Sequence, residues 1–268
     1  DATQRARPLP EVPPLDDPDR RAQGHARLRA ALSTDPDGCW VAEDDEGLAG
    51  VTLALRRDSY WILSLLAVRV GAQGLGIGRL LMDAALRSRE GARNGLILAS
   101  GDPRALRRYH AAGFALHAGF EAAGPVDRAL IPAGLRVRDV DLATDLEPLQ
   151  RVVQRLRGAR FGPELATLAQ VPGRRVLVTD GPARGFVLLR PGGVLWLAAD
   201  DEAAAARLLW AAIAECGETA AVEWLTNGQQ WAIDVAMQAR LSFWRGNTVC
   251  RWGEQVPFHP YLPSGVYG

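Results

Sequence analysis

The chain contains no lysine: all 31 of its basic residues are arginine, against 31 acidic residues and a formal net charge of zero. The absence of lysine excludes a Schiff-base lysine and the lysine of a nucleotide-binding phosphate loop. Without a basic excess, binding to nucleic acid by neutralising phosphates is not expected. No apolar run approaches the roughly 18–20 residues of a membrane span, so we expect no membrane partner either.

Cysteine is scarce as well. Cys39, Cys216 and Cys250 are far apart and form no CxxC motif. An odd number of scattered cysteines favours reduced thiols and a cytoplasmic location over a disulfide framework. His25 and His259 have no ligand-like spacing to a cysteine or a carboxylate, so we predict no metal site.

The length of 268 residues suits two domains of about 130 residues each. Periodicity in the first half predicts the strands 39–43, 48–55 and 60–68, the helix 79–89, the strand 95–100, the helix 103–112 and a strand from 114. The second half repeats this order with the strands 175–179, 185–189 and 194–199, the helix 202–215, the strand 220–226, the helix 229–239 and a strand from 241. We therefore predict an α+β protein made by a diverged internal duplication.

A glycine-rich loop at 71–78 joins a predicted strand to an amphipathic helix. Glycines let the backbone approach a ligand closely, and the first N–H groups of a helix bind anions. Such a loop alone is equally compatible with a tight connection. A Rossmann loop fits poorly, because this loop follows the third predicted strand and no acidic residue ends a following strand.

Two motifs carry a family resemblance. The spacing Gln73-x-x-Gly76-x-Gly78 matches an (Arg/Gln)-x-x-Gly-x-(Gly/Ala) signature, and residues 102–114 match an Asn-x-x-Ala-x-x-x-Tyr-x-x-x-Gly-Phe block with Asp102 in place of Asn. Both resemble the GNAT superfamily of acyl-CoA N-acyltransferases, over about residues 38–120. The resemblance implies two tandem GNAT-like domains, 1–131 and 132–268, each a mixed, mostly antiparallel sheet flanked by helices.

The resemblance also implies roles for individual residues, with acetyl-CoA as the co-substrate. Tyr109 would act as general acid toward the departing CoA thiolate; its alternative role is that of a core-packing aromatic. Asp102 would stand near the pantetheine arm, but a carboxylate only accepts hydrogen bonds, which leaves its role open. The backbone of Leu66, Ala67 and Val68 would meet the pantetheine arm, and the pyrophosphate would be wrapped by Gln73, Gly74, Leu75, Gly76, Ile77, Gly78 and Arg79.

The glutamate that serves many family members as base has no counterpart here. Ile62 stands at its place, and Ser64 is the one polar side chain between 61 and 68. A hydroxyl is a poor base, so the amine would lose its proton to water, to His117 or Asp58 through a water chain, or to a group from the second domain.

The second half lacks the glycine-rich loop and has Asp200, Asp201 and Glu202 in its place. Three carboxylates suit a helix N-terminus but repel a pyrophosphate. We therefore expect a degenerate second domain that does not bind CoA in the usual way. Its Asn227 and Trp231, with Ser64 of the first domain, are candidates for an acceptor pocket; a domain interface is the alternative for the same residues.

These observations predict an N-acetyltransferase that moves an acetyl group directly from acetyl-CoA to a primary amine of a small molecule or peptide. It would be a monomer whose domains form a pseudo-dimer, or a homodimer. One alternative is a non-catalytic acyl-CoA-binding sensor, suggested by the missing glutamate. Another is acetylation of a small thiol-sugar amine, as in the mycothiol synthases, which share the two-domain layout.

Overall fold

The computed structural model describes residues 18–182, 184–254 and 256–268. These residues fall into two compact units, each built from separate pieces of the chain. We call them the N-terminal unit (residues 18–116, 249–254 and 265–268) and the C-terminal unit (residues 117–248 and 256–264). Residues 1–17, part of the predicted first domain, lie outside the described residues. No described helix is both long enough and apolar enough to cross a membrane.

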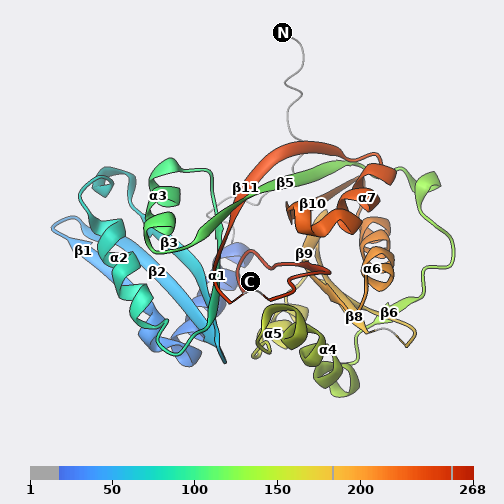
Figure 1. Ribbon diagram of the computed structural model, residues 1–268, viewed down its shortest axis with the longest axis horizontal. Helices are drawn as coiled ribbons and strands as arrows, with labels where there is room; N and C mark the ends of the chain where they lie inside the picture. Colours follow the sequence, from blue (N-terminus) through green and yellow to red (C-terminus); the bar gives the residue numbers. More distant parts are fainter. Residues whose placement is uncertain (1–17, 183, 255) are drawn as a thin grey trace, which may run out of the picture. The chain divides into compact units, whose positions relative to one another are not determined.

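The N-terminal unit is a sheet with helices on both of its faces. Its elements are α1 (Pro18–Thr34), β1 (Cys39–Asp44), β2 (Gly47–Arg57), β3 (Tyr60–Val68), α2 (Ile77–Arg87), β4 (Asn94–Ala99) and α3 (Pro103–Ala111). The first three strands pair in antiparallel fashion, and β3 pairs with β4 in parallel. Figure 1 shows α2 and α3 in front of these strands and α1 behind them. The predicted strands and helices are confirmed to within a few residues.

The core of this unit explains why α2 forms where it does. Leu81, Met82 and Ala85 recur at helical spacing and are almost fully buried, so one face of the helix packs on the strands. Leu80, which the periodicity placed on the same face, is 61% exposed. The buried cluster beneath α2 and α3 includes Trp61, Leu63, Ile97, Tyr109, Phe114 and Cys250.

The C-terminal unit also contains mixed, mostly antiparallel strands with helices. Its elements are β5 (Ala115–Pro125), β6 (Val137–Asp139), α4 (Leu142–Arg157), α5 (Glu164–Ala169), β7 (Arg175–Thr179), β8 (Gly185–Arg190), β9 (Gly193–Ala199), α6 (Glu202–Glu215), β10 (Thr219–Leu225), α7 (Gln230–Gln238), β11 (Ser242–Gly253) and β12 (Tyr261–Leu262). The strand order is β11-β5-β10-β9-β8-β7-β6, with β12 paired to β9.

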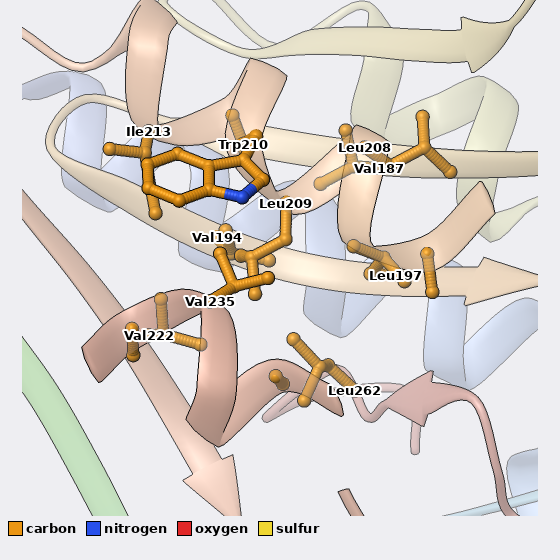
Figure 2. Close-up of a cluster of buried hydrophobic side chains, with 14 of the residues drawn as sticks. Val187, Val194, Leu197, Leu208, Leu209, Trp210, Ile213, Val222, Val235 and Leu262 are labelled. Atoms are coloured by element: carbon orange, nitrogen blue, oxygen red, sulfur yellow. The ribbon is translucent and has the colours of Figure 1, made fainter. Parts of the chain in front are cut away.

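Helix α6 forms the centre of the core of the C-terminal unit. Figure 2 shows its Leu208, Leu209 and Ile213 facing valines and leucines of the strands. The helix begins at the predicted acidic cluster, where the carboxylate of Asp201 accepts the backbone N–H of Ala204 at 2.7 Å. The expected capping role is thus confirmed for Asp201, whereas Asp200 accepts the backbone N–H of Arg184 at 2.7 Å and pairs with Arg155 at 3.0 Å.

The order of elements repeats, as predicted. The series β1-β2-β3-α2-β4-α3-β5 is followed by β7-β8-β9-α6-β10-α7-β11. In both series the third strand pairs in parallel with the fourth.

The two units nevertheless differ from the two continuous segments, 1–131 and 132–268, that the sequence suggested. Strand β5 ends the first series but pairs with β10 in the C-terminal unit, with Ala122 opposite Val222. The end of β11 lies beside β4 in the N-terminal unit, where Trp252 packs against Gly95 and Phe114. Hydrophobic patterning identifies a strand but not its partner, so the sequence could not reveal this exchange.

We expect Gly253→Ala to destabilise the N-terminal unit, although the residue lies near the end of the chain. Gly253 has a left-handed backbone (φ +85°), and a Cβ there would overlap the carbonyl of Arg93. Strain and overlap together should lower the free energy of unfolding by about 2 kcal/mol or more, measured by chemical denaturation. Gly101→Ala is the matched control, because no atom lies within 4 Å of its Cβ position. Equal stability of the two variants would contradict the position that we assign to β11.

Candidate active site

The site begins where β3 and β4 separate. Their parallel ladder runs from Tyr60 opposite Asn94 to Leu63 opposite Ile97 and ends there. The next residue, Ser64, is a bulge in the pairing with β2, which continues from Leu65 to Val68. In the described chain no strand pairs with the other edge of this last part of β3. The predicted pantetheine-binding residues, Leu66 to Val68, therefore lie on an open strand edge.

The glycine-rich loop after β3 presents a row of backbone donors. Gly74 and Gly76 both have left-handed backbones, with φ of +86° and +87°, and no atom lies within 4 Å of either Cβ position. Among the hydrogen bonds of the described chain, none joins the backbone N–H groups of Gly74 to Gly78 to a backbone acceptor. These donors lie at the positive end of α2, as an anion site requires.

Two of the predicted loop residues are otherwise engaged. The backbone N–H of Arg79 donates to the carbonyl of Gly76 at 2.9 Å. The side-chain amide of Gln73 donates to the carbonyl oxygen of Val68 at 3.2 Å, and the backbone N–H of Gln73 donates to the carbonyl oxygen of Val70. Gln73 thus holds the loop against the end of β3, and the geometry leaves ligand contact to the residues that follow it.

A cation that the sequence did not single out lies at this loop. The guanidinium of Arg108, on α3, lies against Gly78, with Nη1 2.7 Å from the position that a Cβ would take. A side chain at this position would push the guanidinium aside, so the glycine leaves room for that cation. Arg108 precedes the predicted catalytic tyrosine, and only the packing of α3 against this part of the unit reveals its position.

Tyr109 lies on α3 and is 6% exposed. Its ring packs in the cluster that contains Leu63 and Ile97, the last pair of the β3–β4 ladder. Burial raises the pKa of Tyr109 to about 12, with a smaller contribution from Cys250 of β11. The phenol is therefore protonated throughout the neutral range, beside the opening between the strands.

Asp102 is the N-cap of α3. Its carboxylate accepts the backbone N–H of Arg104 at 2.8 Å and forms an ion pair with the Arg104 side chain at 2.9 Å. These hydrogen bonds lower the pKa of Asp102 to about 2. Asp102, which replaces the usual Asn of the family pattern, therefore caps the N-terminus of α3.

The candidates for a base are dispersed. Ile62 is buried, and Ser64 contacts Arg27. Asp58 is exposed in the turn before β3, and His117 is exposed on β5 in the C-terminal unit. Among the described residues, no group of three or more His, Cys, Asp or Glu side chains could hold a metal ion.

The two acceptor-site candidates of the second half belong to the C-terminal unit. Asn227 is exposed in a short turn after β10. Trp231 is 5% exposed and packs in the hydrophobic core. The packing of Trp231 is that of a structural side chain; a role of either residue in acceptor binding stays a prediction.

The fold resembles that of known acetyltransferases. A Pyrococcus horikoshii protein named provisionally as an acetyltransferase superposes with a TM-score of 0.73 at 17% identity, over 92% of this chain and 86% of that one. A GCN5-related N-acetyltransferase from Kribbella flavida gives 0.57 at 16% identity, over 89% and 66% of the two chains. One from Sphaerobacter thermophilus gives 0.54 at 15% identity, over 89% and 91%. No curated protein matches the sequence.

These structural similarities show that the chain has the fold of acetyltransferases. The family described as the acetyltransferase (GNAT) domain matches residues 35–122. This stretch contains β3, the glycine-rich loop and α3, so the part of the chain that resembles the GNAT family is the part that holds the candidate site.

We expect Arg108→Met to weaken CoA binding roughly tenfold, because a guanidinium near a phosphate makes charge-assisted hydrogen bonds. Affinity for pantetheine, which lacks the pyrophosphate, should not change. Isothermal titration with both ligands measures this difference. The exposed neighbour Arg107 provides the control variant Arg107→Met. An equal loss for both ligands would show that Arg108 supports the fold rather than the phosphate site.

Proposed function

We propose that the N-terminal unit transfers an acetyl group from acetyl-CoA directly to a primary amine. One arrangement carries the proposal: the buried phenol packs in the cluster of the last β3–β4 pair, the open edge of β3 follows, and the loop with its backbone donors comes directly after that edge. The open edge suits the amide groups of the pantetheine arm, and the donors suit the pyrophosphate. The acetyl thioester then lies at the end of the arm, toward Tyr109.

The reaction needs no covalent enzyme intermediate. The neutral amine attacks the thioester carbonyl carbon, a C–N bond forms, and the C–S bond breaks as the CoA thiolate leaves. The amine gives up one proton to solvent, and the thiolate receives one from Tyr109, which solvent then reprotonates. Binding both substrates in one site provides proximity, and the phenol stabilises the leaving group.

The missing carboxylate at Ile62 supports one competing function, an acyl-CoA sensor without turnover. A sensor would bind acetyl-CoA through the same loop and strand edge. The two functions differ in whether free CoA appears when amines are added.

We expect Tyr109→Phe to lower kcat about a hundredfold, within the usual range for loss of a general acid, and to leave the Kd of acetyl-CoA unchanged. Thiol release with a panel of primary amines measures kcat, and titration measures Kd. Tyr60→Phe is the matched control, because Tyr60 is also buried but lies at the start of β3. Wild-type turnover in Tyr109→Phe would rule out its role as the acid. Binding of acetyl-CoA with no turnover on any amine would favour the sensor.

A further inference from the structure

Arg27, on α1, contacts β3 at the bulge where that strand leaves β4. Its Nη2 atom donates to the carbonyl oxygen of Ser64 at 2.6 Å and to the Oγ of Ser64 at 2.8 Å. Ser64 directly follows Leu63, the last residue of the parallel ladder. The guanidinium therefore lies at the point where an acetyl group at the end of the pantetheine arm would be held.

No described carboxylate pairs with this guanidinium. Two other arginines of the same unit have acidic partners: Arg57 pairs with Asp35 at 2.8 Å, and Arg69 with Asp44 at 2.7 Å. The Nε atom of Arg27 is buried and has no hydrogen-bond partner among the described residues. The Nη1 atom also makes no hydrogen bond with the described residues, but it is accessible to solvent. Burial lowers the pKa of Arg27, against a smaller opposing effect of Tyr267.

An unpaired, partly buried cation is costly to maintain. A side chain that only tied α1 to β3 could do so with neutral groups. A terminal nitrogen that remains open to solvent offers donors to an anion from outside the protein.

The position of Arg27 relative to Tyr109 identifies which ligand it would meet. Tyr109 packs against Leu63 beneath α3, whereas Arg27 reaches Ser64 from α1, which lies on the other side of the strands (Figure 1). The phenol thus serves the leaving thiolate from one face. The guanidinium serves the face that remains for the attacking amine.

We propose that Arg27 binds a carboxylate of the acceptor, so that the substrate is a small amino acid or a related amine that carries a carboxylate near its amino group. The inference rests on the proposed acetyl transfer and specifies its substrate class. Ser64 holds the guanidinium in place through both of its oxygens, and is a positioning residue.

The test compares amino acids with their amides, which differ only in the carboxylate. We expect wild-type protein to acetylate its best amino acid with a kcat/KM at least about tenfold above that of the amide, and Arg27→Met to abolish this ratio. Arg27→Lys, which keeps the charge, should restore part of it. Arg29→Met, an exposed site on the same helix, should behave as wild type. A wild-type protein that acetylates amides as fast as acids would overturn the inference but not the proposed function.

A binding arm tests the inference even without turnover. N-acetyl amino acids and N-acetyl amino amides are titrated into the CoA-bound protein. Binding of the acids that is lost in Arg27→Met, with the circular dichroism and the CoA affinity unchanged, supports the carboxylate site even if no acetyl transfer occurs. Equal binding of acids and amides, or equal loss in Arg29→Met, would overturn the carboxylate site.

Discussion

The parallel pairing of β3 with β4 lasts for four residue pairs, and the chemistry of the N-terminal unit depends on its early end. A strand edge without a partner leaves backbone polar groups that must be satisfied in another way. Side chains satisfy part of this demand, since Arg27 and Gln73 donate to the carbonyls of Ser64 and Val68. The polar groups that remain on this edge are those that the proposed pantetheine site would use.

The second half of the chain contributes to this arrangement through the end of β11. Cys250 is fully buried in the cluster that holds Tyr109, and Trp252 packs on Phe114 and stacks with Arg89 at 4.1 Å. These contacts help to exclude water from the phenol and so contribute to its raised pKa. The residues that set the acidity of the catalytic candidate are thus separated from it by about half of the sequence, and the N-terminal unit needs the end of the chain in place.

The parts of the site that were predictable are those that local sequence determines. Left-handed turns at Gly74 and Gly76 and a helix after them follow from glycine spacing and amphipathic periodicity, and the family resemblance located Tyr109. The positions of Arg27, Arg108 and Cys250 depend on which helix or strand packs beside them, and no local pattern records this. Trp231 shows the same limit: its sequence context of polar residues does not reveal that its ring packs in the core of the C-terminal unit.

The replacement of the expected glutamate by Ile62 and the position of Arg27 bear on the same step. Arginine stays protonated and cannot accept a proton, Asp102 is occupied by Arg104, and Ile62 replaces the glutamate of the family pattern. A fixed cation close to the acceptor lowers the pKa of its ammonium group, because like charges disfavour the charged form. Neutralising the acceptor carboxylate also removes the negative charge that had favoured the ammonium. Arg27 would therefore raise the fraction of neutral amine at a given pH, which is what a general base would otherwise have to do.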